Sequence, residues 1–123
     1  MSENPKTDGK PYDLEERTFL FAKNVRLFVK ALPRTIGNVE DAKQLVRASG
    51  SVPANYIEAN ESLGKKDFQM HIKISRKEAK ESRLFLRLMD LETADKLEKS
   101  RAALIDEASQ FIKIFTAILA KSA

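Results

Sequence analysis

The chain has 123 residues, of which 42% are hydrophobic and 33% are charged, and its net charge is +4. This composition is typical of one folded domain, and the mildly basic balance permits a nucleic-acid partner without requiring one. The absence of cysteine and the single histidine exclude disulfides, zinc–thiolate sites and a histidine metal cage within one chain. Because no 18 apolar residues run together and residues 1–12 are polar, we expect a cytoplasmic protein.

Few glycines and prolines interrupt the chain, and apolar residues recur at helical spacing, so we expect four helices. Residues 1–12 should form a flexible tail and residues 13–123 one bundle domain. The first helix should begin after Asp13 as its N-cap and end at Pro33. Its apolar line follows a seven-residue repeat: Leu14, Thr18, Phe21, Val25, Phe28 and Leu32.

A second helix should begin at Asn38 and continue, kinked between Ser49 and Pro53, until Gly64 closes it as a left-handed C-cap. Gly64 is also a candidate for opening the next helix. A third should cover residues 65–91, and Thr93 should cap a fourth. The core line of the fourth helix is Leu97, Leu104, Ala108, Phe111, Phe115 and Ile118. Four amphipathic helices with short loops predict an all-α, antiparallel, up-down-up-down four-helix bundle.

The third and fourth helices are apolar over a wider arc than one core requires. The additional positions are Ile74, Leu84, Phe85, Leu88 and Leu91, followed by Ile105, Ile112, Ile114 and Leu119. Monomers rarely expose so much apolar surface, so we predict a homo-oligomer and assign Phe85 a structural or interface role. A thicker core within one chain is the alternative.

Basic residues line one side of the third helix, within a sector of about 100°. They are Lys66, Lys73, Arg76, Lys80, Arg83 and Arg87, and we call them the basic stripe. Rows of Lys and Arg displace the counterions condensed on phosphate backbones, so we predict that the stripe binds RNA or another nucleic acid. Two alternatives remain. The stripe is a solvent-facing helix side whose charge is neutralised by Glu or Asp of neighbouring helices or subunits, or it is a docking surface for an acidic protein partner.

The segment 54–59 combines an amide, a phenol and a carboxylate, from Asn55, Tyr56 and Glu58. We predict a structural role, in which Asn55 or Tyr56 hydrogen-bonds a neighbouring backbone at the kink. No nucleophile and base are evident within reach of each other, so we expect no enzymatic activity and no cofactor.

His71 and Glu78 lie two helical turns apart beside the apolar arc, with Glu81 nearby. A di-iron bundle requires Glu-x-x-His pairs on two helices, and this chain has one histidine, so we expect no metal. We predict instead partly buried polar contacts that fix packing at an interface, with Arg17 or Arg26 as the facing cation.

Several segments form a recognisable set: YDLEERT at 12–18, FA at 21–22, SVPANYIEA at 51–59, KKDF at 65–68 and KEAKE at 77–81. Together they resemble the bacterial four-helix bundle proteins of the S23-like family, encoded in intervening sequences of 23S ribosomal RNA genes. The resemblance implies a ring-like homopentamer. Similar accessory proteins of diversity-generating retroelements bind nucleic acid and a reverse transcriptase, which implies RNA association for this chain.

Overall fold

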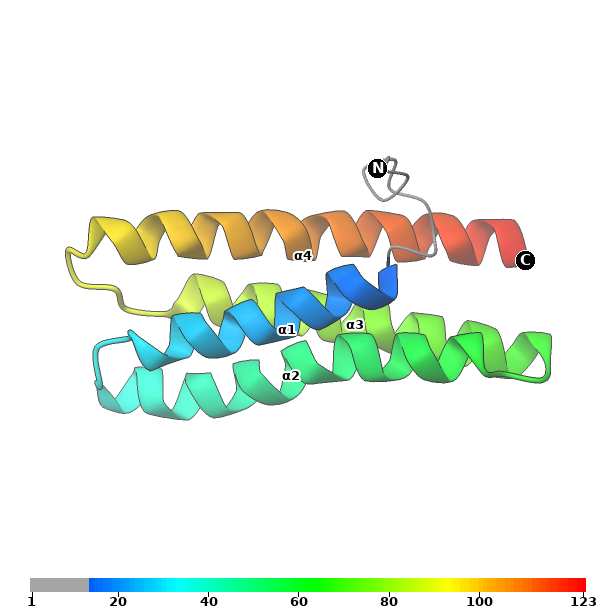
Figure 1. Cartoon of the computed structure of the whole chain (residues 1–123), viewed down its shortest axis with the longest axis horizontal. Helices are drawn as coiled ribbons and strands as arrows, with labels where there is room; N and C mark the ends of the chain where they lie inside the picture. The colour runs from blue at the N-terminus through cyan, green and yellow to red at the C-terminus, as the bar shows by residue number, and fades with distance from the viewer. Residues whose placement is uncertain (1–13) are drawn as a thin grey trace.

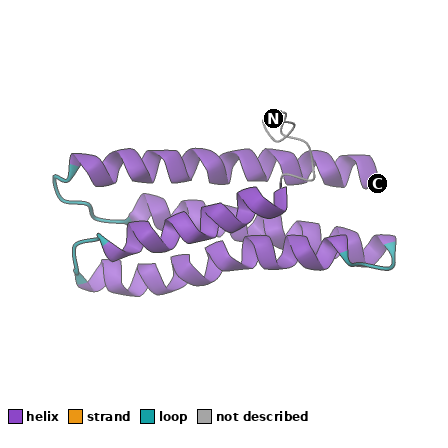
Figure 2. Cartoon of the chain, in the orientation of Figure 1, coloured by secondary structure: helices purple, strands orange, loops and turns teal. Residues whose placement is uncertain are grey.

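A computed structural model describes residues 14–123 as four helices joined by short connections (Figure 1, Figure 2). They are α1 (Leu14–Lys30), α2 (Ile36–Asn60), α3 (Lys65–Leu88) and α4 (Asp95–Ser122). No strand occurs within this described range, and the predicted all-α class is confirmed. The predicted N-cap Asp13 and the predicted tail lie outside the described residues.

The helices pack in chain order around one core, and α1 also packs against α4. The α1–α2 and α3–α4 connections lie at one end of the bundle, while the α2–α3 turn and the C-terminus lie at the other (Figure 1). Each helix therefore runs antiparallel to the next, which confirms the up-down-up-down topology. None of the four described helices is both long and apolar enough to cross a membrane.

Aromatic rings fill the centre of the bundle. The rings of Phe21 and Phe111 meet edge to face with centroids 5.4 Å apart, and the Tyr56 ring lies 6.0 Å from that of Phe115. Every position of the predicted apolar line of the first helix is buried. In the fourth, positions 104, 108, 111 and 115 are buried, while 97 and 118 pack partly buried against this core. The seven-residue periodicity therefore located the core correctly.

Small side chains let α2 and α3 approach each other closely. The buried small residues are Ala48, Ser49 and Val52 of α2 and Ser75, Ala79 and Ser82 of α3. Ser75 Oγ donates a hydrogen bond to the Val52 carbonyl at 3.0 Å, directly before Pro53. As predicted, α2 continues through Pro53 as one helix, and its axis changes direction near the middle (Figure 1).

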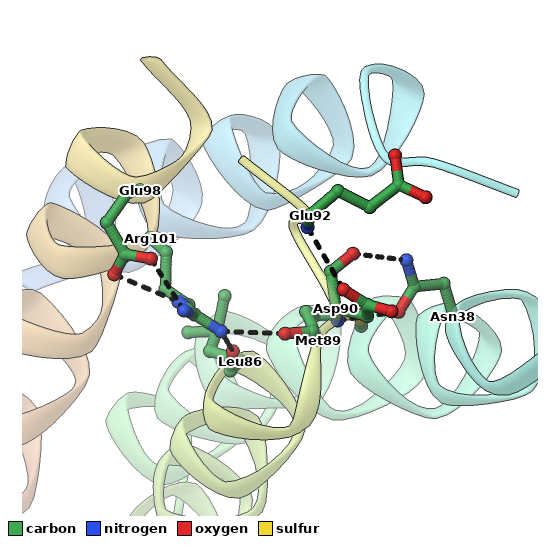
Figure 3. A network of polar contacts seen from close by, with 7 residues as sticks. All are labelled: Asn38, Leu86, Met89, Asp90, Glu92, Glu98 and Arg101. Atoms are coloured by element: carbon green, nitrogen blue, oxygen red, sulfur yellow. Dashed lines mark hydrogen bonds and ion pairs between the residues drawn. The ribbon is translucent and has the colours of Figure 1, made fainter. Parts of the chain in front are cut away.

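Asn38 joins the two connections at one end of the bundle, and α2 begins at Ile36, two residues before the start at Asn38 that the sequence predicts. Thr35 caps α2, because its side chain accepts from the Asn38 backbone N–H. The Asn38 side chain is buried and donates to the Pro33 carbonyl at 2.8 Å. It also donates to the Asp90 carbonyl at 2.8 Å, while its Oδ1 accepts from the Asp90 N–H at 2.9 Å (Figure 3). A contact with a residue 52 positions away thus outweighs the local capping preference.

The end of α3 also differs from the prediction, since the helix stops at Leu88 and Met89 is extended. Arg101 of α4 provides hydrogen bonds to carbonyls at the end of α3: it donates to the Met89 carbonyl at 2.8 Å and to the Leu86 carbonyl at 3.4 Å (Figure 3). Orphan carbonyls at a helix C-terminus need such donors. Glu98 holds the same guanidinium at 2.6 Å.

Two further capping predictions are wrong. Gly64 is extended, with φ −138° and ψ 159°, so it is not a left-handed C-cap, whereas its other predicted role, opening the next helix, is confirmed because it is the N-cap of α3. Thr93 is exposed in the connection, and Ala94 precedes the first turn of α4 without a side-chain cap. The left-handed residue in the described chain is Glu92, with φ 57°.

The surplus apolar positions divide into two groups. Those of α4 (105, 112, 114 and 119) pack partly buried against the core of their own chain, as does Phe85, and Leu91 is buried. A thicker core accounts for this group. Leu84 and Leu88 of α3 remain 46% and 53% exposed, as do Met70 at 47% and Leu27 of α1 at 56%.

Candidate nucleic-acid interface

The basic stripe runs along the outer side of α3 for most of the helix. From Lys66 to Arg87 the axial length is about 32 Å, at 1.5 Å per residue. Lys66, Lys73, Lys80 and Arg87 are exposed, whereas Arg76 and Arg83 are partly buried where α3 meets α4. The structure therefore brings all six predicted residues onto one elongated surface.

No acidic side chain neutralises this stripe within the described part of the chain. Across residues 14–123, none of its six side chains has a carboxylate within the 4.0 Å that defines an ion pair. The ion pairs of this range involve other cations, such as Arg17 with Glu107 and Arg101 with Glu98. Acidic residues of the same chain therefore do not neutralise the stripe within the described residues.

Hydroxyl groups of α4, in contrast, hold the two arginines of the stripe that face it. Arg76 Nη1 donates to Thr116 Oγ1 at 3.2 Å, and Arg83 Nη1 donates to Ser109 Oγ at 3.1 Å. Thr116 donates its own hydroxyl hydrogen to the Ile112 carbonyl at 2.7 Å, which leaves its lone pairs for the guanidinium. A hydroxyl is neutral, so each arginine is oriented while its positive charge stays uncompensated.

Three residues of α4 therefore belong to this surface, and sequence analysis missed them. Ser109 and Thr116 lie seven residues apart, like Arg83 and Arg76 on the antiparallel helix that they face. Lys113 lies between them in sequence and is exposed, which adds a further cation on the same helix side. The matched spacing was the available signal, but the register between α3 and α4 is needed to interpret it.

Asn55 and His71 meet across the α2–α3 interface. Asn55 Nδ2 donates to the Ser51 carbonyl at 3.0 Å, four residues earlier in α2 itself, and not to the backbone of a neighbouring helix. Asn55 Oδ1 therefore faces His71 Nδ1 at 3.1 Å, so this ring nitrogen carries the hydrogen. His71 Nε2 lies 3.5 Å from Asp67 Oδ1. The predicted partly buried contact of His71 exists, and it lies within one chain.

Tyr56 and Glu58, assigned a structural role with Asn55, differ in their surroundings. Tyr56 is buried against Phe115, and burial raises the pKa of its phenol above the usual 10.0. Glu58 is exposed, and its backbone carbonyl accepts from Ser62 Oγ at 3.0 Å. Only Tyr56 of these two is placed to support the core.

Glu78 lies partly buried near the α2–α3 interface. Burial raises the pKa of its carboxyl above the usual 4.5, and the neighbouring Glu81 raises it further. Lys77 Nζ, 3.8 Å away, opposes this shift. Within one chain neither Arg17 nor Arg26 faces these carboxylates, so the expected contact remains a prediction only between subunits. Arg17 pairs with Glu107, and Arg26 donates to the Ala22 and Val46 carbonyls.

Metal binding has no support in the side-chain arrangement of the described residues. Across residues 14–123, no three His, Asp or Glu side chains are grouped so that they could hold an ion. Polar groups in the interior are few and serve packing, as with Thr18 Oγ1, which donates to the Leu14 carbonyl at 2.6 Å.

The family model of the 23S rRNA-intervening sequence proteins matches residues 11–117. The chain belongs to this family. The fold is also similar to the crystal structure of a protein of unknown function from the S23 ribosomal protein family of Bacteroides thetaiotaomicron. Sequence identity is 22% and the TM-score is 0.70, over 86% of this chain and 97% of that one. No curated protein matches the chain. Family membership and fold are thus established, whereas the biochemical role in this family is uncharacterised.

Proposed function

We propose that this member of the 23S rRNA-intervening sequence family is a non-enzymatic protein that binds nucleic acid, foremost RNA, through the basic stripe of α3. One observation carries the proposal: within the described residues, six cations share one helix side and none has a carboxylate partner within 4.0 Å. An unpaired row of this kind gains free energy when phosphates replace its counterions.

A homopentamer is part of the same proposal. Leu84, Leu88 and Met70 on α3, and Phe19, Leu20 and Leu27 on α1, leave apolar surface for contacts between copies. A ring would present the stripe several times, and multivalent phosphate contacts strengthen binding without any new type of contact. Light scattering should give a mass five times the 13.9 kDa of one chain. A monomer at micromolar concentration would contradict this part.

Charge reversal within the stripe tests the RNA proposal. We expect the triple variant Arg76→Glu, Lys80→Glu and Arg83→Glu to lose binding of a labelled 20-base-pair RNA duplex at 50 mM salt, while circular dichroism shows an unchanged bundle. The control reverses three exposed lysines outside the stripe, Lys23, Lys30 and Lys99. It has the same net charge, so retained binding in the control assigns the effect to the stripe. Equal RNA affinity of the triple variant and the wild type would refute the proposal.

A second candidate is a scaffold that docks an acidic protein through the same surface. The observation in its favour is the exposed apolar group Met70, Leu84 and Leu88, because protein interfaces combine apolar and cationic residues. The double variant Leu84→Ser and Leu88→Ser separates the two functions. RNA affinity should stay within about twofold if phosphates are the ligand and light scattering shows that the variant keeps the wild-type assembly, since these side chains carry no charge. A protein partner would be lost.

A further inference from the structure

The hydroxyl-held arginines between α3 and α4 indicate more than a general positive surface. We infer that Thr116 and Ser109 are positioning residues, which hold Arg76 and Arg83 in place for the phosphodiester backbone of a nucleic acid. This inference rests on the proposed function, and it specifies which part of the nucleic acid is recognised and which uncharged residues contribute.

The first support is the repeated geometry. Arg76 to Thr116 and Arg83 to Ser109 form two equivalent hydrogen bonds, at 3.2 and 3.1 Å, from the same guanidinium atom Nη1. The two arginines are seven residues apart, or about 10.5 Å along the helix axis. One of the five N–H donors of each guanidinium is used, so the others stay available for phosphate oxygens, which arginine binds in bidentate geometry.

The second support is the type of side chain that holds each arginine, a hydroxyl or a carboxylate. Two other arginines of the described residues are bound by a carboxylate: Glu107 holds Arg17 through two hydrogen bonds of 3.1 and 2.8 Å. Glu98 likewise holds Arg101. A carboxylate would cancel the charge that an anionic ligand needs. A hydroxyl orients the arginine side chain and leaves its charge intact. The conformational entropy of that side chain is then already lost in the free protein, so binding costs less.

The third support is that the surface suits the phosphodiester backbone of a nucleic acid better than its bases. Proteins that bind exposed bases stack them on aromatic side chains. The aromatic residues of α3, Phe68 and Phe85, pack against the core, and those of α4, Phe111 and Phe115, are buried. The stripe therefore offers cations and hydroxyls and no stacking ring among the described residues of these helices. Such a surface contacts phosphates and reads no sequence.

Isosteric substitution of the hydroxyls tests the inference. The double variant Thr116→Val and Ser109→Ala keeps every charge. We expect its affinity for the 20-base-pair RNA duplex to fall about threefold to tenfold, which is the effect of releasing two immobilised side chains. The slope of log K against log salt should not change, because the number of cations is the same. A Thr116→Ser variant, which retains the hydroxyl, should bind within about twofold of the wild type.

Three outcomes overturn the inference. One is wild-type affinity in the hydroxyl double variant, and another is a reduced salt slope, which would mean that a phosphate contact itself was lost. The third is a preference above about tenfold between duplexes of unrelated sequence, which backbone recognition does not produce. Each of these can occur while the triple charge-reversal variant still loses binding. The inference can therefore fail while the proposed function holds, whereas an unaffected charge-reversal variant refutes both.

Discussion

On its side toward α1, helix α4 presents Glu107 to Arg17, whereas on its side toward α3 it presents Thr116 and Ser109 to Arg76 and Arg83. The first arginine also lies over the Phe111 ring, 5.4 Å from its centroid. The chain thus uses the same side chain for two purposes. Charge neutralisation accompanies packing on one side of α4, and retained charge accompanies an open surface on the other.

The difference shows how a bundle can place cations without destabilising itself. An arginine that lies over a buried ring between two helices gains from a carboxylate, because a partly desolvated charge needs a partner. An arginine at the surface can stay unpaired at little cost, since water and salt screen it. The following predictions test whether the two sides of α4 differ in this way.

The largest effect should come from Asn38, which joins the α1–α2 connection to the α3–α4 connection. Asn38→Ala removes three hydrogen bonds of a buried side chain and leaves partly buried backbone groups of Pro33 and Asp90 unpaired. We expect a loss of about 2–4 kcal/mol in the free energy of unfolding. Urea denaturation measures it. Asn24→Ala, at an exposed asparagine of α1, is the control and should change this free energy by less than about 0.5 kcal/mol.

Thr116→Glu should convert the side of α4 toward α3 into a copy of the side toward α1. A carboxylate beside Arg76 neutralises a cation of the stripe and repels phosphate, so we expect RNA affinity to fall about 10-fold to 100-fold at 0.1 M salt. Stability should change by less than about 1 kcal/mol, because surface ion pairs contribute little. Fluorescence anisotropy with the RNA duplex gives the affinity.

The control for this variant is Ala103→Glu, which adds the same charge to α4 beside the apolar depression between α1 and α4. It should bind RNA within about threefold of the wild type, through its effect on net charge alone. Equal losses in both variants would mean that the local environment of Arg76 is irrelevant.

Removing each arginine should produce opposite patterns. Arg17→Met should lower the free energy of unfolding by about 1–2 kcal/mol, because Glu107 loses a bidentate partner and Phe111 loses a cation. Arg76→Met should leave stability within about 0.5 kcal/mol and should weaken RNA binding. Thermal unfolding and RNA titration of both variants provide the test. If Arg76→Met proves the more destabilising of the two, the distinction between the two sides of α4 is lost.

The smallest effect concerns Glu78, a partly buried acid whose pKa is raised by burial and by Glu81 and lowered by the charges of Lys77 and Arg47. Burial raises the pKa of its carboxyl in the folded state, so the folded protein binds this proton more tightly than the unfolded chain does. Stability from this group is present below pH 4.5 and is lost as the pH rises through the raised value.

Glu78→Gln removes this dependence. At pH 7 it should stabilise the protein by about 0.5 kcal/mol or less, and the gain should vanish below about pH 4. In a Lys77→Gln background the gain should increase, since Lys77 lowers the pKa of Glu78. Melting temperatures across this pH range measure the effect. A gain that grows on acidification would contradict the assigned direction of the shift.

Much of the fold follows from the sequence because helical periodicity is local information. The apolar repeats predict four helices and the core, and the spacing of the cations from Lys66 to Arg87 predicts the stripe. The errors arose where distant residues decide. Asn38 resembles an N-cap locally, yet its side chain bonds to Asp90. The surplus isoleucines of α4 pack partly buried against the core of their own chain, a placement that depends on how α4 sits against the other helices.

The candidate site was predictable only in part for the same reason. A row of cations on one helix is visible in the sequence, but exposed serines and threonines occur on most helices. Ser109 and Thr116 gain meaning only from the register that places them opposite Arg83 and Arg76. The partner of Arg17 was equally hidden, because Glu107 lies 90 residues away.

The salt dependence of RNA binding tests the central claim most directly. Binding of the wild-type protein to a 20-base-pair RNA duplex should be measured from 50 to 300 mM salt, beside the triple variant Arg76→Glu, Lys80→Glu and Arg83→Glu. We predict that log K falls linearly with log salt for the wild type, with a slope of about −4 or steeper, and that the variant does not bind. No binding by the wild type at 50 mM salt, or an affinity that salt does not change, would contradict the account.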